Sequence, residues 1–278
     1  MYTHQSAVVG EPDITLNRVH TLFNSADVGG ERVLRFGVIC TPMGDNLWQC
    51  HDSPMVSRDL DLVLFDLDGT LTDSGPGILR CIEYALEDQG IQFPERDQMR
   101  SYLGSPLAVT FGEVFGMNDQ QITIAIDKYR ERYHDVGLVE NSVYPGVPEL
   151  LSELQSAGLR LVTATSKPEY SATRILQYFE LDQYFEFIGA AALDGTRDSK
   201  SLVIGHTLEN TNTSPTSHNM IMIGDRHHDV HGAREYGIDT IGVLWGYGDA
   251  AELQDAGVSD LAADTQSLKA LLLDSSGS

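Results

Sequence analysis

Two aspartates directly after a short apolar segment are the feature that most constrains the fold of this chain. The apolar run spans Leu62 to Phe65, and it leads into Asp66 and Asp68, which stand just before Gly69-Thr70. A short run that is apolar throughout predicts a strand of a parallel sheet that is buried on both faces. Ligands of such sheets bind at the carboxyl ends of the strands, where both aspartates fall. No basic residue lies in the turn to neutralise the two acids. They therefore predict a site for a hard divalent cation such as Mg²⁺. The alternative is an ordinary turn, since Asp and Gly also favour turns for local reasons.

Strands and helices are predicted to alternate in the carboxyl-terminal half of the chain. Short apolar runs are followed repeatedly by stretches with helical periodicity, and Gly or Pro residues separate them. This alternation is typical of an α/β fold with a doubly wound parallel sheet and helices on both faces. We expect strands at residues 159–164, 185–190, 220–223 and 239–243, and helices at 147–157, 168–179, 201–208, 229–236 and 268–273.

A long helical segment separates the first strand from this alternating region. Apolar residues recur at helical spacing in 78–86, 107–114 and 120–134, and Asn118-Asp119 is a good N-cap signal for the last helix. The segment is too long for an ordinary connection, so it predicts a separate helical domain above the carboxyl edge of the sheet. The expected organisation is an N-terminal extension at 1–58, weakly ordered or a small appendage, a catalytic core made of 59–74 and 144–278, and a helical domain at 75–143.

Composition and charge restrict the partners and the compartment. Lys and Arg number 18 against 41 Asp and Glu, a net charge of −23, which disfavours binding to nucleic acid because both partners would be polyanions. The three cysteines form neither a CxxC pair nor an even disulfide framework. No apolar run approaches the roughly 18 residues that span a bilayer, and the N-terminus lacks the layout of a signal peptide. We therefore expect a cytoplasmic protein that binds neither nucleic acid nor membrane, and either a monomer or a dimer is compatible with the sequence.

Polar residues also follow the other predicted strands. Thr165 and Ser166 follow the second strand, Lys200 opens a helix after the third, and Asp225 ends the fourth, with Asp229 four residues further on. Each has a local alternative as a helix cap or a solvated first-turn residue. Because the carboxyl ends of parallel strands meet at one edge of the sheet, polar residues at four successive strand ends predict a shared site.

These segments resemble, in order and spacing, the four signature motifs of the haloacid dehalogenase-like hydrolases. The segments are Asp66–Thr70, Thr165–Lys167, Lys200 and Gly224–Asp229, and the resemblance covers about residues 59–273. The helical insertion is similar to the C1 cap of the phosphoglycolate phosphatase and 5′-nucleotidase-like branch of that family. The segments around Thr165 and Lys200 also resemble actinobacterial members described as protein tyrosine kinases. The family resemblance implies a Rossmann-like core with an inserted cap domain.

The resemblance also implies the roles of individual residues. Asp66 would be the nucleophile that forms an aspartyl-phosphate, and Asp68 would protonate the leaving alkoxide and then deprotonate the attacking water. Mg²⁺ would be held by Asp66, by the backbone carbonyl of Asp68 and by Asp225. Asp68 would pair with Thr70. Asp229 would orient Lys200 or a metal-bound water. Thr165 and Lys200 would complete the catalytic set, and contacts to phosphate would come from Leu67, Gly69, Thr165, Ser166 and Lys200.

Three other segments receive structural interpretations. His227 and His228 are expected to be loop residues, since they lack ligand spacing to other His or Cys residues. The segment Trp245–Gly248 is expected to be a packed or rim loop. Arg130 and Arg132 could meet an anionic substrate, although surface ion pairs on their own helix are the simpler interpretation.

We therefore predict a Mg²⁺-dependent phosphatase whose partner is a small phosphorylated metabolite. Its substrates would be small phosphomonoesters of the phosphoglycolate, nucleotide or sugar phosphate type. Two alternatives stay open: a phosphotransferase that acts on a protein tyrosine, and a non-catalytic regulatory protein that senses phosphate. The intact set of acidic and basic residues argues against the non-catalytic alternative.

Overall fold

The computed structural model describes residues 26–28, 31–34, 38–42, 48–52, 60–94, 99, 103–104 and 106–273. The chain divides into two compact units, Met1–Ser57 and Arg58–Ser278. In the first unit four antiparallel strands pair in sequential order: β1 (Ala26–Val28), β2 (Glu31–Leu34), β3 (Val38–Pro42) and β4 (Trp48–Asp52). The expected appendage therefore contains a small sheet, and the rest of 1–58 lies outside the described residues.

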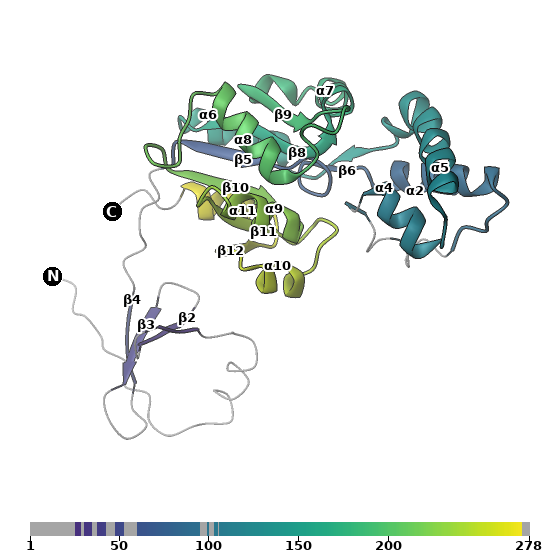
Figure 1. Ribbon diagram of the computed structural model, residues 1–278. Helices are drawn as coiled ribbons and strands as arrows, with labels where there is room; N and C mark the ends of the chain where they lie inside the picture. The colour runs from purple at the N-terminus through teal and green to yellow at the C-terminus, as the bar shows by residue number, and fades with distance from the viewer. Residues whose placement is uncertain are drawn as a thin grey trace. The chain divides into compact units, whose positions relative to one another are not determined.

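The second unit is built on a six-stranded parallel sheet (Figure 1). The strand order is β12-β11-β10-β5-β8-β9, which places β5 between β10 and β8. The predicted α/β fold with a doubly wound parallel sheet is confirmed. The strands are β5 (Leu62–Phe65), β8 (Arg160–Pro168), β9 (Phe187–Ala191), β10 (Met220–Gly224), β11 (Asp239–Val243) and β12 (Asp260–Ala262).

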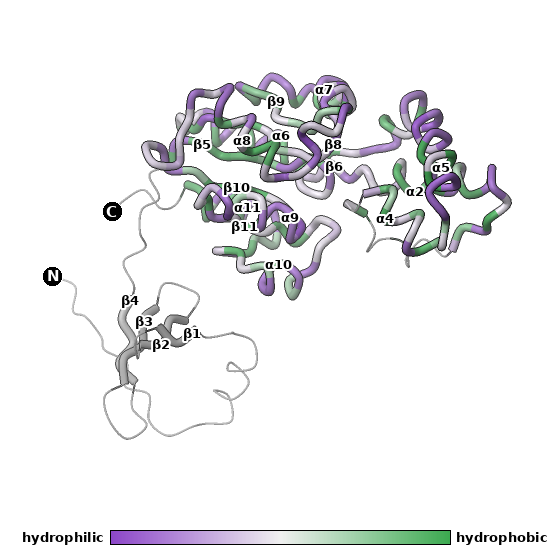
Figure 2. The backbone as a smooth tube through the Cα atoms, in the orientation of Figure 1, coloured by the Kyte–Doolittle hydropathy of each residue, from purple (hydrophilic) through white to green (hydrophobic). Residues whose placement is uncertain are grey.

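Helices cover both faces of this sheet because the strand side chains alternate between two apolar clusters. Val63 and Phe65 of β5 pack in one cluster with residues of α6, α7 and α11, whereas Leu62 and Leu64 pack in the other with residues of α8 and α9. Figure 2 shows the resulting hydrophobic centre, with hydrophilic stretches on the outer helices. The helices are α6 (Val147–Ser156), α7 (Glu169–Tyr178), the 3₁₀ turn η4 (Asp182–Tyr184), α8 (Lys200–Asn210), α9 (His227–Arg234), α10 (Ala250–Ala256) and α11 (Thr265–Leu273).

The segment between β5 and β8 is helical, as its apolar spacing predicts. A short antiparallel pair, β6 (Thr72–Asp73) and β7 (Ser142–Val143), brackets the helices. The side chain of Asn118 caps α5 by accepting from the backbone N–H of Gln121 at 3.1 Å. The helices are α2 (Gly75–Asp88), α4 (Leu107–Val109) with the π-helical turn η2 (Thr110–Val114), and α5 (Asp119–Arg132) with the π-helical turn η3 (Tyr133–Gly137).

We call residues 75–143 the cap. Helices α2 and α5 pack together, and Figure 1 shows the cap to one side of the sheet, reached from it through β6. The cap belongs to the same compact unit as the sheet, so its treatment as a separate domain stays a prediction. Within the described residues no helix is both long enough and apolar enough to cross a bilayer.

Candidate active site

The carboxyl ends of neighbouring strands bring three acidic side chains together. Phe65 of β5 is in register with Ile223 of β10, so Asp66 and Asp225 emerge close to one another at the same edge of the sheet. Asp229 lies in the first turn of α9, which follows β10 directly. Asp66, Asp225 and Asp229 each offer a carboxylate oxygen, and these oxygens lie within 4.8 Å of one another. We call these residues the three-acid cluster.

Lys200, the first residue of α8, inserts its ammonium group into this cluster. Its Nζ lies 2.8 Å from Asp66 Oδ1 and 2.8 Å from Asp229 Oδ1. The same Nζ donates to the backbone carbonyl of Ala164 at 2.8 Å. Burial opposes the charge of Lys200, but Asp229 and Asp66 outweigh it and raise the pKa of the lysine. Lys200 therefore carries a positive charge between two carboxylates.

The three-acid cluster carries more negative charge than Lys200 neutralises. Burial raises the pKa of Asp66 to about 6; Lys200 acts in the opposite direction, and Asp229 adds to the increase. Burial, with the added repulsion of Asp229 and Asp66, raises the pKa of Asp225 well above its ordinary value. Three carboxylates and one ammonium leave a formal charge of about −2, which a divalent cation would balance. The donors are all oxygen atoms, so the cluster fits a hard cation such as Mg²⁺.

The turn after β5 is shaped around Asp225. Gly69 has a φ of +86°, and a Cβ atom at this position would lie 2.2 Å from Asp225 Oδ2. The same Oδ2 accepts from the backbone N–H of Tyr247 at 2.7 Å. Thr70 Oγ1 donates to Asp225 Oδ1 at 3.4 Å. The expected pairing of Thr70 with Asp68 is therefore wrong, because the threonine side chain is directed at Asp225.

Asp68 pairs with a lysine to which the sequence assigned no role. Lys167 Nζ donates to Asp68 Oδ2 at 2.6 Å, and both side chains are largely buried. Burial disfavours the charge of Lys167, but Asp68 and Tyr133 outweigh it and raise the pKa of the lysine. Thr165 and Lys167 are buried and Ser166 between them is exposed, and this spacing of two is the sequence signal that could have identified Lys167.

The remaining predicted residues occupy different positions around the site. Thr165 is buried and lines the pocket, and its Oγ1 accepts from the backbone N–H of Lys167 at 3.2 Å. Ser166 is exposed and also lines the pocket. The side chain of Leu67 is buried in the core, so only its backbone could contact phosphate. The carboxylate of Asp68 lies outside the three-acid cluster, and its backbone carbonyl stays a predicted metal ligand.

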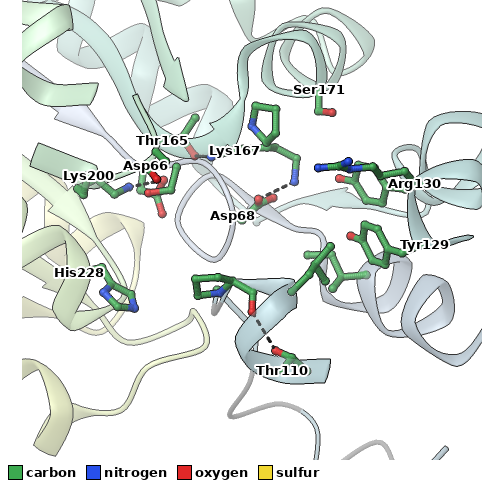
Figure 3. Close-up of a pocket in the computed structure, with 18 of the residues that line it drawn as sticks. Asp66, Asp68, Thr110, Tyr129, Arg130, Thr165, Lys167, Ser171, Lys200 and His228 are labelled. Carbon is green, nitrogen blue, oxygen red and sulfur yellow. Dashed lines mark hydrogen bonds and ion pairs between the residues drawn. The ribbon is translucent and has the colours of Figure 1, made fainter. Parts of the chain in front are cut away.

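A pocket of about 360 Å³ joins these residues to the cap (Figure 3). Asp66 and Lys200 lie on one side in the figure, and Asp68 and Lys167 lie closer to the cap residues Tyr129 and Arg130. Arg130 lines the pocket and, as expected, also pairs with Asp127 of its own helix at 3.9 Å, whereas Arg132 is bound to Glu140 at 2.7 Å. The cap contributes mainly apolar and aromatic residues to the lining: Ile78, Ile82, Gly104, Pro106, Leu107, Thr110, Tyr129, Arg130, Tyr133 and His134.

The structure corrects the position of the two histidines. His227 and His228 are the first residues of α9 and not loop residues, and His227 Nδ1 lies 2.6 Å from Glu252 Oε1. Neither belongs to the acidic group that could hold a metal among the described residues. The segment Trp245–Gly248 packs against the site as expected: Trp245 Nε1 donates to the carbonyl of Thr70 at 3.0 Å.

Comparison with known proteins identifies close relatives of this chain. The family model of haloacid dehalogenase-like hydrolases matches residues 63–243. A 5′-nucleotidase of Pseudomonas aeruginosa is 39% identical over 210 residues, which are 76% of this chain and 94% of that protein. The tyrosine-protein kinase PtkA of Mycobacterium tuberculosis is 44% identical over 189 residues, which are 68% of this chain and 64% of PtkA. The crystal structure of a predicted phosphatase from Clostridium acetobutylicum has a TM-score of 0.73 and 39% identity, and the match covers 77% of this chain and 99% of that one.

Proposed function

The chain belongs to the haloacid dehalogenase-like hydrolases, and we propose that it is a Mg²⁺-dependent phosphatase that hydrolyses small phosphomonoesters through an aspartyl-phosphate. Phosphatase relatives support its classification as a phosphomonoesterase. The observation that carries the proposal is the position of Asp66, whose Oδ1 lies 2.8 Å from the Lys200 ammonium and whose carboxylate lies beside those of Asp225 and Asp229. A nucleophilic carboxylate needs this combination of fixed orientation and nearby cation sites.

Asp66 is the nucleophile in this proposal. Lys200 fixes Asp66 Oδ1 at 2.8 Å, so the carboxylate is held in one direction as the substrate enters. Burial raises the pKa of Asp66 to about 6, and Lys200 acts in the opposite direction and favours the carboxylate that the reaction needs. Lys200 and the Thr165 hydroxyl, which both line the pocket, would bind the phosphoryl oxygens on which charge accumulates.

Asp66, Asp225 and the backbone carbonyl of Asp68 would hold the Mg²⁺ ion, with Asp229 beside them. The ion would neutralise charge, so that a carboxylate could approach a phosphate dianion. Support for this assignment comes from the uncompensated charge of the three-acid cluster and from its oxygen-only donors.

Asp68 would carry the proton in both steps. Asp68 would enter the first step as the carboxylic acid, with Lys167 hydrogen-bonded to one of its oxygens. As the bond from Asp66 to phosphorus forms, the bond from phosphorus to the leaving oxygen breaks, and that oxygen takes the proton of Asp68. A water then attacks the phosphorus and gives a proton to Asp68, and the bond from Asp66 to phosphorus breaks. Inorganic phosphate leaves, and both aspartates return to their initial states.

The proposal is tested by turnover of p-nitrophenyl phosphate with Mg²⁺. The variant Asp66→Asn should lose at least about 10³-fold in rate, because no covalent intermediate can form. Asp255→Asn is a matched control at an exposed position of α10, and it should retain wild-type activity. Wild-type rates in Asp66→Asn would refute the mechanism, and inactivity of the wild type on a broad phosphoester panel would favour the non-catalytic sensor.

The similarity to PtkA favours a second candidate, phosphoryl transfer to a protein tyrosine. Tyr170 and Tyr178 are exposed acceptor candidates on α7. Incubation with γ-labelled ATP distinguishes the two functions. Alkali-stable label that disappears in Tyr170→Phe or Tyr178→Phe would support the kinase, and release of free phosphate alone would support the phosphatase.

A small phosphorylated metabolite is the partner that we propose. The pocket of about 360 Å³ is at the small end of the range for ligand pockets. A panel of phosphoglycolate, nucleoside monophosphates, sugar phosphates and phosphotyrosine would identify the preferred class. The cytoplasmic location stays a prediction from the sequence.

A further inference from the structure

The carboxylate of Asp68 is held by a single hydrogen bond. Lys167 Nζ binds Asp68 Oδ2 at 2.6 Å. Asp68 Oδ1 is buried and has no hydrogen-bond partner among the residues that the structure describes. Lys167 is therefore the one group in the described chain that fixes the direction of this carboxylate (Figure 3).

Lys167 is itself held from two sides. On the side of the sheet, the backbone N–H of Lys167 donates to Thr165 Oγ1 at 3.2 Å. On the side of the cap, Nζ lies 5.2 Å from the ring centroid of Tyr133, a cation–π contact. The ring of Tyr129 stacks on that of Tyr133, with centroids 5.3 Å apart and an interplanar angle of 12°. The backbone of Lys167 is thus fixed within β8, and its side chain is held by the aromatic rings of the cap.

The two buried lysines of the pocket serve different carboxylates. Lys200 contacts Asp66 and Asp229, and Lys167 contacts Asp68. Figure 3 shows the two pairs as separate groups, with the Asp68 pair nearer to the cap. Since the cap side of the pocket is where the leaving group would lie, Lys167 is placed beside proton transfer and not beside the nucleophile.

We propose that Lys167 is a positioning residue that aligns the carboxylate of Asp68 for proton exchange with the leaving-group oxygen, and that Tyr133 of the cap holds the lysine in place. The inference rests on the proposed phosphatase function, in which Asp68 donates its proton as the bond from phosphorus to the leaving oxygen breaks. A carboxylate with one anchor loses its fixed direction when the anchor is removed, and a 1 Å misplacement can cost about 10²-fold in rate.

The test compares two leaving groups in the full-length protein with Mg²⁺. p-Nitrophenolate leaves readily without a proton, whereas the alkoxide of ethyl phosphate needs one, so only the second substrate depends strongly on Asp68. kcat/KM is the quantity to compare, since it reports the steps up to release of the leaving group. Lys167→Met should lose about 10²-fold or more on ethyl phosphate and less than about tenfold on p-nitrophenyl phosphate. Lys167→Arg should restore most of the loss on ethyl phosphate.

Equal losses on both substrates in Lys167→Met would overturn the proposal, because they would indicate a phosphate-binding or purely structural role. The variant Asp68→Asn should reproduce the selective loss, and adding Lys167→Met to it should cause little further loss on ethyl phosphate. Fully additive losses would also contradict the proposal.

A second variant keeps the test valid if Lys167→Met folds poorly. Tyr133→Leu removes the ring and leaves the lysine and its partner Asp68 unchanged. We expect a selective loss of about threefold on ethyl phosphate, in line with an ordinary cation–π contact, and no selectivity would contradict the role of Tyr133. If wild-type protein turns over neither substrate, the proposed function itself fails, which separates the two outcomes.

Discussion

The backbone N–H of Tyr247 donates to Asp225 Oδ2 at 2.7 Å, so the loop after β11 directly supports an acid of the three-acid cluster. The phenol of the same residue reaches the start of the cap. It accepts from the backbone N–H of Gly75 at 2.8 Å and donates to Asp73 Oδ1 at 3.1 Å. One residue thus connects the candidate metal site with the point where the chain enters the cap.

Tyr247→Phe separates these two contacts. The variant keeps the backbone bond to Asp225 and removes the bonds of the phenol to Asp73, Ser74 and Gly75, so we expect a loss of about 1–2 kcal/mol in the free energy of unfolding. The Mg²⁺ concentration that gives half-maximal activity should change less than about twofold. Chemical denaturation and a Mg²⁺ titration measure the two effects. Tyr178→Phe, an exposed control on α7, should change neither; a large shift in the Mg²⁺ requirement of Tyr247→Phe would contradict this division of roles.

Gly69→Ala should reduce stability and activity far more than the same substitution at another glycine with a positive φ. The new Cβ would lie 2.2 Å from Asp225 Oδ2, in addition to the strain at a φ of +86°. At Gly90, φ is +69° and a new Cβ would have no atom within 4 Å. We expect Gly90→Ala to cost about 1 kcal/mol from backbone strain alone and to stay active. Gly69→Ala should lose at least about 2 kcal/mol more and most of its activity, as measured by thermal unfolding and phosphatase assay.

The contacts of the Glu252 carboxylate should stabilise the folded protein by an amount that depends on pH. Its Oε1 accepts from Arg226 Nε at 2.8 Å and from the backbone N–H of His227 at 3.0 Å. Burial opposes the charge, but these contacts outweigh it and lower the pKa of Glu252 to about 2, from an ordinary value of 4.5. Between these values the unfolded chain binds more protons, so the contribution is complete above about pH 4.5 and is lost as the pH falls toward 2.

Glu252→Gln tests this contribution. Because the carboxylate is only partly buried, solvent screening reduces its worth to about 1 kcal/mol. The variant should be less stable than wild type by about that amount at pH 6, and the difference should shrink as the pH approaches 3. Urea denaturation at several pH values measures this stability difference. A difference that grows toward low pH would contradict the prediction.

The strands of the sheet other than β12 could be predicted because each contains a short apolar run. Strand β12 and helix α10 were not predicted, because both are short and neither has a clear pattern of apolar residues. β12 is three residues long, Asp260–Ala262, and is defined by its pairing with β11 and not by its own pattern. The seven residues of α10 are too few for a clear helical period. The π-helical turns that end α4 and α5 likewise have no residue pattern of their own.

The acidic residues of the site could also be predicted, because strand ends converge in any parallel sheet. The partners of those residues could not. Lys167 and Asp68 are 99 positions apart, and Tyr247 and Asp225 are 22 apart. Their contacts depend on how loops fold over the sheet edge. A period-two interpretation of β8 would have placed Lys167 beside Thr165, but only the structure identifies Asp68 as its partner.

Asp225→Asn should make the metal-free protein more stable while it impairs catalysis. Burial and the repulsion of Asp229 and Asp66 raise the pKa of Asp225, which means that the folded state disfavours its negative charge. Removing that charge should stabilise the metal-free protein at pH 8 by about 1–2 kcal/mol. The amide oxygen of asparagine can still accept from the backbone N–H of Tyr247, so the loop should keep its position.

The same variant should respond weakly to Mg²⁺. Wild-type protein gains stability when the cation binds the folded state alone, so its thermal midpoint should rise on replacing EDTA with Mg²⁺, whereas that of Asp225→Asn should rise much less. Phosphatase activity should fall by about 10²-fold or more at ordinary Mg²⁺ concentrations. Differential scanning fluorimetry with EDTA and with Mg²⁺ gives both midpoints. Asp239→Asn, an exposed change at the start of β11, should behave as wild type. If Asp225→Asn is destabilised in EDTA, the three acids do not repel one another in the way that their burial implies.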